Sequence, residues 1–482
     1  MVRDFTYSIV ELERFLTEHN ADDGIMHALR NIKHAIYDYQ IMKFGLQPPP
    51  LQNSTVSSKS AKWVPKSHVQ MFLQSILCAC SPTDNSTHLE DDASTSLSVG
   101  SETQGSRNSS ITSVAGKGWT IGESARNTKI DYNDEKMYQE HLKQLGRNWN
   151  LDIIALSNFK ACMQNGPIVC VGRVLIDPVG ERIHPDFKRS LTPLLSMIQD
   201  VYLPNPYHNA LHGACVAHMT AVLTKALGLR QYLTPIEEFA YLIAALGHDA
   251  GHPGKTNAFL RSTQNPLALI YNDTSILENY HASLVCHILK SQEWFLKHLS
   301  QQDWENVRRR IIQLVLATDM MSHFTHVNNV KDRRLNGTFD YKKNAEDLWY
   351  LMVLCIKMAD IGHNFLPWCD HLPWTKVLFD EFHMQGDEER LLSMPLLLFF
   401  DRSRSADIPD SQLGFFQGFT MPLMEELTLA NPESEYIKRY IIVHAHNNLE
   451  NWKKYSKRSL DDIAHELESS DEVAVIEDAF VD

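Results

Sequence analysis

The sequence lacks several features that would place it in other protein classes. Its start, Met1-Val-Arg-Asp-Phe, has neither the apolar segment of a secretory signal nor the Met-Gly start that myristoylation needs. The longest apolar stretch in the first third, Val69 to Cys80, contains polar residues and is too short to cross a bilayer. We therefore expect no secretory signal and no transmembrane segment.

A basic surface and metal-binding cysteine spacings are missing as well. The net charge of −14 over 482 residues argues against nucleic acid as a partner, because such domains usually carry a basic patch. The eight cysteines are scattered, and Cys215, Cys286 and Cys355 lie in helical patterns that suit buried, reduced thiols, which favours a cytoplasmic protein. Cys78 and Cys80 adjoin an apolar patch, where small core thiols are the simpler interpretation and acylation is the alternative.

The organisation is uneven along the chain. Residues 1–81 carry apolar residues at helical spacing before Pro48–Pro50 and predict a small helical region, a regulatory or homodimerisation element. Residues 82–128 are rich in Ser, Thr, Asn and Gly and predict a disordered linker. Residues 129–458 read as helix after helix without alternating strand runs, so we expect an all-α main body, followed by a mobile acidic tail at 459–482.

Three strongly apolar helices are predicted to end at acidic residues. One starts at the Thr234-Pro235 cap and delivers His248-Asp249. Another is capped by Asn344 and reaches Asp360, and a third, Val307 to Leu316, ends just before Asp319. The last helix of the main body is expected from Asn431 to about Lys457.

These helix ends predict a metal site. Taken singly, a buried histidine is more often a satisfied core residue and an aspartate at a helix end more often a cap. His208 and His212, however, are four apart, which would put them on one helix face. Burying several ionisable groups is costly unless a shared cation offsets the cost. Two imidazoles with two carboxylates suit Zn²⁺ tightly and Mg²⁺ or Mn²⁺ more loosely.

Six motifs give the chain a family resemblance over about residues 140–455. In order, they are Asn205-Pro-Tyr-His-Asn-x-x-His212, His248-Asp-x-x-His-Pro-Gly-x-x-Asn257, Tyr271-Asn-Asp-x-Ser-x-Leu-Glu278-Asn, Ala317-Thr-Asp-Met320, Ala359-Asp360 and Ser411-Gln-Leu-Gly-Phe415. Together they resemble class I 3′,5′-cyclic nucleotide phosphodiesterases, whereas the His-Asp pair alone is shared with the wider HD hydrolase group. The resemblance implies a compact multi-helix catalytic domain. It also implies two-metal hydrolysis of the 3′ ester of cyclic AMP or cyclic GMP to the 5′-monophosphate, which ends cyclic-nucleotide signals.

The resemblance also implies roles for single residues. The tight metal, expected to be zinc, would be held by His212, His248, Asp249 and Asp360, with Asp249 also reaching a second metal, magnesium or manganese. His208 matches the general acid and Glu278 the acid that orients it, while His252, His281, Thr318 and Asp319 match outer positions of the site. Gln412 would hydrogen-bond the purine and Phe415 would stack on it opposite Leu378. The remaining pocket residues would be Tyr207, Asn257, Met320, Phe382 and Gln385.

Four residues depart from the family pattern. Gly251 stands where many relatives have an acid, and Tyr280 where a histidine is common. His363 and His371 fall beside the expected purine pocket and make the nucleotide preference the open question. Because every metal position and the acid are present, we expect an active enzyme. The alternatives are an HD-type hydrolase of another nucleotide phosphate ester and a non-catalytic protein that binds cyclic nucleotides.

Overall fold

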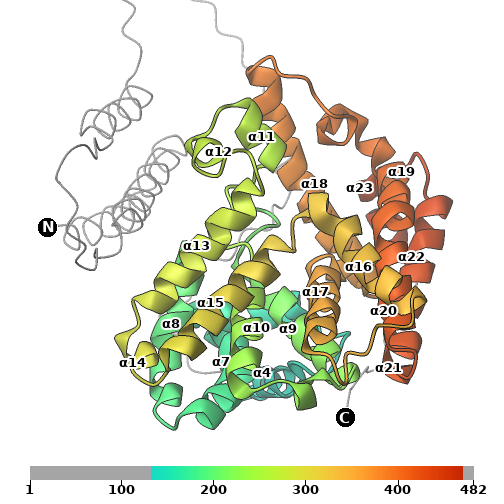
Figure 1. Ribbon diagram of the computed structural model, residues 1–482. Helices are drawn as coiled ribbons and strands as arrows, with labels where there is room; N and C mark the ends of the chain where they lie inside the picture. The colour runs from blue at the N-terminus through green and yellow to red at the C-terminus, as the bar shows by residue number, and fades with distance from the viewer. Residues whose placement is uncertain (1–131, 470–482) are drawn as a thin grey trace, which may run out of the picture. The chain divides into compact units, whose positions relative to one another are not determined.

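The computed structural model describes residues 132–469, and these are helical without a single strand (Figure 1). This confirms the all-α prediction for the part described. The predictions for the N-terminal region at 1–81, for the linker at 82–128 and for Cys78 and Cys80 fall outside the described residues.

The first helices build one side of the domain. Their bounds are α4 Tyr132–Gln144, α5 Ile153–Ser157, α6 Lys160–Asn165, α7 Pro167–Ile183 and α8 Phe187–Val201. The helices α7 and α8 pack against each other along their length, and α7 also packs on the next two long helices of the chain. This layer supplies hydrophobic support and contains none of the predicted site residues.

The centre of the domain is formed by helices that bury apolar faces against one another. They are α9 Ala210–Ala226, α10 Pro235–Gly247, α13 Ile276–Lys290, α15 Gln301–Leu316 and α17 Ala345–Asp360. The segments between them contain the short η1 Leu229–Tyr232, α11 Asn257–Ser262, α12 Pro266–Ile270, α14 Glu293–Leu296 and η2 Met320–Ser322, and the longer α16 His323–Leu335. Helix α10 packs against α7, α9, α13 and α15, and α17 packs against α9 (Figure 1).

The caps predicted for the central helices are present. The Thr234 hydroxyl and the Glu237 carboxylate form a reciprocal capping box at the start of α10, and the Asn344 side chain accepts from two backbone N–H groups of α17. The third apolar helix is longer than predicted, since α15 begins at Gln301 behind a capping box of Ser300 and Asp303. The first two turns of α15 are polar, so the apolar pattern in the sequence indicated only the part of the helix from Val307 onward.

The C-terminal helices complete the domain on the right of Figure 1. They are η3 Gly362–Phe365, α18 Trp368–Leu391, η4 Leu398–Phe400, η5 Arg402–Asp407, α19 Ile408–Phe415, a π-helical turn Phe416–Thr420, α20 Met421–Ala430, α21 Glu435–Ile437, a second π-helical turn Lys438–Ile442, α22 Val443–Lys454 and α23 Leu460–Ser469. The helix predicted from Asn431 to Lys457 therefore runs from Glu435 to Lys454, with a π-turn inside it.

The predicted mobile tail from Ser459 is wrong for residues 460–469. They form α23, whose Leu460 and Ile463 are buried in a cluster with Trp452, Tyr455 and other apolar residues. The many acids of this segment favour a mobile tail, but Leu460 and Ile463 give it an apolar face. The acids lie on the other side of an amphipathic helix.

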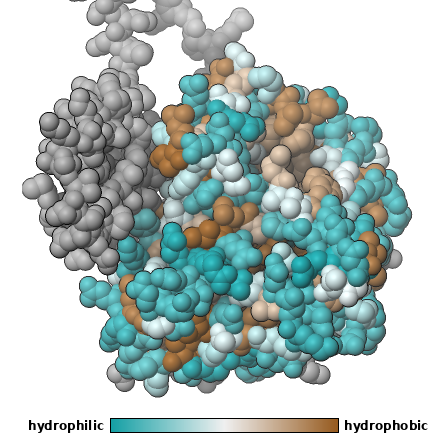
Figure 2. Space-filling view, in the orientation of Figure 1, coloured by the Kyte–Doolittle hydropathy of each residue, from teal (hydrophilic) through white to brown (hydrophobic). Residues whose placement is uncertain are grey.

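The visible surface is largely hydrophilic, with hydrophobic side chains gathered in patches (Figure 2). Exposed apolar residues are frequent where α18 ends and the chain continues to η4, namely Leu391, Leu392, Leu397 and Leu398. None of the helices in residues 132–469 combines the length and the apolar character that crossing a membrane requires. The predicted burial of Cys215, Cys286 and Cys355 is confirmed, and all three are free thiols.

Candidate active site

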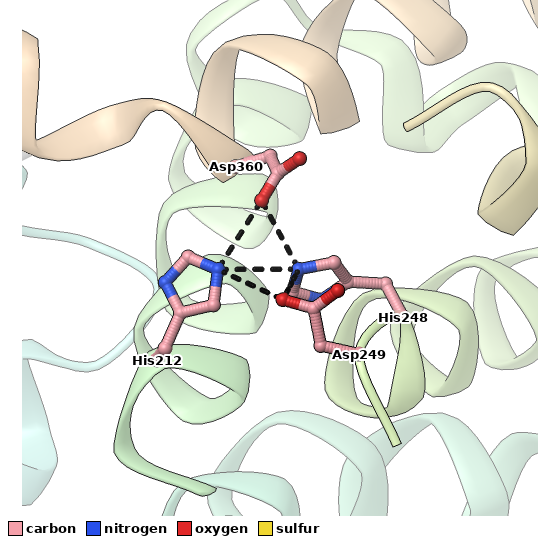
Figure 3. A group of neighbouring side chains, drawn as sticks. All are labelled: His212, His248, Asp249 and Asp360. Atoms are coloured by element: carbon pink, nitrogen blue, oxygen red, sulfur yellow. Dashed lines mark hydrogen bonds and ion pairs between the residues drawn. The ribbon is translucent and has the colours of Figure 1, made fainter. Parts of the chain in front are cut away.

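Four side chains from three central helices converge at the middle of the domain (Figure 3). The Nε2 atoms of His212 and His248 lie 3.3 Å apart, and each lies close to Asp360 Oδ1, at 3.2 and 3.1 Å. Asp249 Oδ2 lies 3.4 Å from Nε2 of His212 and 3.1 Å from Nε2 of His248. Bonds of about 2.0–2.1 Å to a tetrahedral ion place ligand atoms roughly 3.3 Å from one another. The spacing of this set therefore fits one divalent cation.

The ends of the helices bring the four groups together. His248 caps the C-terminus of α10 and Asp249 follows it, while Asp360 is the last residue of α17. His212 lies in the first turn of α9, which Asn209 caps by accepting from the backbone N–H groups of Leu211 and His212. The expectation that His208 shares this helix face is wrong, because α9 begins only after Asn209 and leaves His208 in the preceding loop.

Hydrogen bonding and charge prepare these groups for a cation. His248 Nδ1 lies 2.9 Å from the Ala245 carbonyl and donates to it, so that Nε2 is left as an acceptor. Burial raises the pKa of Asp360 and Asp249, but the positive charge of His248 in its protonated form outweighs burial and holds both pKa values well below their usual range. Two carboxylates therefore stay charged in a buried position, which is the condition for binding a metal rather than a proton.

His208 is held beside this cluster by Glu381 from α18. Its Nδ1 lies 2.5 Å from Glu381 Oε1, and the backbone N–H groups of Tyr207 and His208 both donate to Glu381 Oε2 at 3.0 Å. Burial lowers the pKa of His208, but the Glu381 carboxylate outweighs it and raises the pKa to about 9. The ring also stacks on His252, with centroids 4.0 Å apart.

Glu278 does not contact His208, contrary to the role that the resemblance implied. It accepts from Asn257 Nδ2 at 3.2 and 2.9 Å, and Asn257 Oδ1 in turn accepts from the backbone N–H of Leu277. These contacts link the start of α11 to α13. Burial and the nearby Asp319 raise the pKa of Glu278 to about 7. The carboxylate that orients His208 is Glu381, and this is a correction to the prediction.

The sequence that carries these side chains matches a known protein family. Residues 207–440 match the family of 3'5'-cyclic nucleotide phosphodiesterases. Residues 207–440 form a domain of this family. The matched segment contains all four clustered residues, His208 and Glu381.

Curated relatives agree with the family match. The chain is 37% identical over 264 residues to the "Dual 3',5'-cyclic-AMP and -GMP phosphodiesterase beta" of Plasmodium falciparum, covering 55% of this chain and 23% of that protein. It is 32% identical to the "cGMP-specific 3',5'-cyclic phosphodiesterase delta" of the same organism, covering 65% and 44%. It is 31% identical to the human "High affinity cAMP-specific and IBMX-insensitive 3',5'-cyclic phosphodiesterase 8A", covering 65% and 39%. The chain thus spans less than half of each of these relatives.

The outer positions of the phosphodiesterase domain surround the cluster. His281 Nδ1 donates to the Ala250 carbonyl at 2.6 Å, and its Nε2 lies 3.7 Å from Asp249 Oδ1. The Thr318 hydroxyl donates to a carbonyl at the end of α15, and Asp319 accepts from Ser275 and caps η2.

Two of the residues that depart from the family pattern, Gly251 and Tyr280, lie against each other. Gly251 has a φ of +76°, and a Cβ on it would lie 2.9 Å from Cε1 of Tyr280.

The residues predicted to bind the base occupy two elements. Gln412 is buried in α19, and Phe415 at the end of that helix stacks on Phe419 with centroids 5.2 Å apart. Leu378 and Phe382 are half-buried on α18, where Phe382 packs edge-on to Phe379 and Phe400. Met320 is half-buried at the start of η2. Their contact with a nucleotide stays a prediction.

Two predicted pocket residues already have structural partners in the phosphodiesterase domain. The Gln385 amide accepts from the backbone N–H of Thr256 and donates to the Thr256 hydroxyl and to Glu389, so it holds the start of α11. Tyr207 is buried, and its ring centroid lies 4.6 Å from that of His212.

A separate cavity of about 280 Å³ is lined by His383, Leu398, Phe399, Arg404, Asp407, Ile408, Asp410, Ser411 and Lys457, and none of these is a predicted site residue.

Sequence reasoning missed Glu381 and Lys357. Glu381 lies at the spacing of one helix face with Leu378, Phe382 and Gln385, which were predicted to line the pocket. That periodicity was the available signal. Lys357 is buried on α17 and donates to the carbonyls of Ala317 and Asp319 at 2.7 and 3.3 Å. Burial lowers the pKa of Lys357 to about 8.

Proposed function

We propose that this phosphodiesterase domain hydrolyses the 3′ ester bond of a purine 3′,5′-cyclic nucleotide and releases the nucleoside 5′-monophosphate. The observation that carries the proposal is the convergence of two imidazole nitrogens and two carboxylate oxygens next to an imidazole, His208, that is paired with a buried carboxylate. The printed names of the relatives support the substrate class, since they describe enzymes acting on cyclic AMP, cyclic GMP or both.

We infer that His212, His248, Asp249 and Asp360 hold Zn²⁺ and that Asp249 also reaches a second ion, Mg²⁺ or Mn²⁺. The mixed nitrogen and oxygen donor set suits zinc, whereas a second site with fewer protein donors suits a harder, hydrated ion. When bound, the two cations would offset the negative charge of the phosphate and promote ionisation of the attacking water.

The proton for the leaving group comes from His208. Cleavage of the 3′ ester produces an alkoxide that needs a proton, and a protonated imidazole at hydrogen-bond distance is suited to supply it. With its pKa raised to about 9, His208 carries this proton at neutral pH. Glu381 fixes Nδ1 and so leaves Nε2 to face the substrate. His252, stacked on the ring, limits its rotation.

The base is proposed to bind beside α19. Gln412 would hydrogen-bond the purine edge and Phe415 would stack on its face opposite Leu378, while Tyr207, Asn257, Met320, Phe382 and Gln385 shape the remaining wall. Residues 129–458 would supply the catalytic machinery, and residues 1–81 a regulatory contact or a homodimer contact.

Side-by-side turnover of cyclic AMP and cyclic GMP tests the proposal. The His208→Ala variant should lose at least about 100-fold in kcat, which is the usual size of a general-acid contribution, and should still bind nucleotide. His446→Ala is the matched control, because His446 is exposed on α22. Hydrolysis of a nucleoside triphosphate without turnover of either cyclic nucleotide would favour the HD-hydrolase alternative. Binding without turnover in the unaltered protein would favour the regulatory alternative.

Metal removal tests the role of the four clustered residues. Chelation should abolish turnover, and Zn²⁺ with Mg²⁺ or Mn²⁺ should restore it. Metal analysis of the purified His212→Ala variant should show loss of bound zinc, whereas His446→Ala should retain it. Full activity in a metal-stripped sample would refute this mechanism.

A further inference from the structure

A group of metal-binding side chains lies outside the active site, at the corner between α7 and α8. His184 follows the last residue of α7, and Asp186 precedes the first residue of α8. His298 lies in the connection between α14 and α15. One ring nitrogen of each histidine and one carboxylate oxygen of Asp186 lie within 4.8 Å of one another. Every other such group among residues 132–469 contains active-site residues, whereas this corner cluster shares none with that site.

The Asp186 carboxylate faces both imidazoles of the corner cluster. Its Oδ2 lies 3.7 Å from His184 Nδ1 and 3.8 Å from His298 Nε2. The two rings are stacked, with centroids 3.8 Å apart and planes inclined by 21°, so both nitrogens meet the same oxygen. Ligand atoms around a tetrahedral zinc lie roughly 3.3 Å apart, so the cluster is about 0.4–0.5 Å wider than a bound set. The side chains of His184 and Asp186 are 39% and 62% exposed, which leaves them room to rotate and close on an ion.

The ring nitrogens that face Asp186 are suited to bind a cation. His184 Nδ1 accepts from the backbone N–H of Asp186 at 3.2 Å, so it carries a lone pair and no proton. A cation would take over this lone pair, and the N–H group belongs to an exposed residue that water can reach. Nε2 of His298 is buried and has no hydrogen-bond partner among the described residues. Burial, with His184 and Lys297 nearby, lowers the pKa of His298, which favours its neutral form.

The donor set indicates which metal fits the corner cluster. Two imidazole nitrogens and one carboxylate oxygen suit zinc and its neighbours in the first transition row, whereas Mg²⁺ and Ca²⁺ prefer oxygen ligands. Three protein ligands leave the fourth position of a tetrahedral ion for water. A buried ring nitrogen without a partner carries a desolvation cost, and a bond to a metal would remove that cost.

We propose that His184, Asp186 and His298 bind Zn²⁺ in a site of their own, separate from the zinc of the proposed catalytic mechanism. The ion would join the α7–α8 corner to the connection after α14. These elements are already in contact, since α14 packs on α8 (Figure 1). The buried Phe187 ring of α8 meets Trp294 and Phe295 of α14 edge-on at 5.4 and 5.5 Å. Zinc at the exposed edge of this contact would stabilise the folded chain, because the assembled ligand set exists only there.

Metal counting in the full chain is the first test. After dialysis against the same low concentration of free Zn²⁺, the wild-type protein should hold one more equivalent of zinc than His298→Ala. His446→Ala removes an exposed histidine of α22 and is the matched control, which should hold as much zinc as the wild type. The circular dichroism spectra of the three proteins should coincide and so show that His298→Ala is folded.

Asp186→Asn supplies a second test, because it keeps the size of an exposed side chain and removes its charge. In His212→Ala, which lacks a ligand of the proposed catalytic zinc, added Zn²⁺ should still raise the melting temperature by binding the folded state. The same addition should leave the melting temperature of the double variant with His212→Ala and Asp186→Asn unchanged. This comparison decides alone if His298→Ala does not fold. A simple ion pair between Asp186 and the histidines would not make stability depend on zinc.

Each outcome supports or overturns the corner site. Equal zinc content in the wild type and His298→Ala would overturn it, as would a zinc-induced rise in melting temperature that persists in the double variant. Loss of zinc from His446→Ala as well would mean adventitious binding by exposed histidines and would also overturn it. If the wild type hydrolysed neither cyclic nucleotide, the proposed function would fail, but the difference in zinc content between the wild type and His298→Ala would remain.

Discussion

At the scale of single residues, Glu381 binds both the backbone of the loop before α9 and the ring of His208. Its carboxylate accepts from two backbone N–H groups and from the His208 ring. Burial raises the pKa of Glu381, but the adjacent His208 outweighs burial and lowers that pKa to about 2, so the group is ionised throughout the working range. It therefore stabilises the protonated form of His208, which is the form that a general acid needs.

Glu381→Gln should lower kcat/KM by about 100-fold and change its pH dependence. The amide keeps an oxygen for the two backbone N–H groups but removes the charge that raises the pKa of His208 to about 9. Activity falls as pH rises through the pKa of the acid, so in the variant the alkaline fall should begin at a lower pH. A pH profile of kcat/KM measures this shift.

Asp347→Asn is the control for that substitution. Asp347 is also a buried carboxylate that pairs with a cation, Arg333, and accepts from a backbone N–H, that of Asp340. It lies at the opposite end of α17 from Asp360. The control should lose stability but keep the wild-type pH profile. An alkaline limb that stays in place in Glu381→Gln would remove Glu381 from its positioning role.

At the scale of elements, the contact between α18 and η4 depends on one glycine. The backbone carbonyl of Phe400 comes so close to Gly386 that a Cβ there would lie 2.0 Å from its oxygen. This close approach fixes the end of the helix that carries Glu381, Leu378 and Phe382. Gly414 in α19 is the opposite case, because a Cβ there would meet nothing within 4 Å.

Gly386→Ala should therefore destabilise the protein, and Gly414→Ala should not. A clash with backbone can be relieved only by moving α18 or η4, so we expect a loss of several kcal/mol, beyond the typical ~1 kcal/mol of a point substitution. Alanine at an unhindered helical position gains about 0.5–1 kcal/mol relative to glycine. Thermal or urea unfolding of both variants measures the difference, and equal stability of the two would contradict the packing described here.

At the scale of the whole molecule, α23 closes the hydrophobic cluster behind α19 and α22. Leu460 and Ile463 are buried there against Trp452 and Tyr455. Fully burying an aliphatic side chain contributes about 1.5–3 kcal/mol. The helix therefore supports Trp452, whose indole donates to His371.

A chain ended after Arg458 should be less stable than one ended after Ser469. We expect the shorter chain to lose roughly 4 kcal/mol relative to the longer one, from the two buried side chains, with the full-length protein as the reference. Thermal unfolding of the three chains tests this expectation. If the two truncated chains melt together, α23 contributes nothing to the domain.

The sequence by itself determined the helical class, the buried helices with their caps at Thr234 and Asn344, and the identity of the four clustered residues. The helices and their caps follow from local patterns, because apolar spacing and caps act within a few residues, whereas the set of four clustered residues came from the family resemblance. The order of motifs along the chain then indicated the family.

Only the tertiary structure decided which carboxylate meets His208 and where α9 begins relative to that residue. Glu381 reaches His208 across 173 residues of sequence, and Trp452 reaches His371 across 81. Such contacts depend on how helices cross, and crossing is set by the packing of whole faces rather than by any local repeat. The apolar face of α23 can be read from the spacing of Leu460, Ile463 and Leu467, but only the tertiary structure shows that Trp452 and Tyr455 cover it.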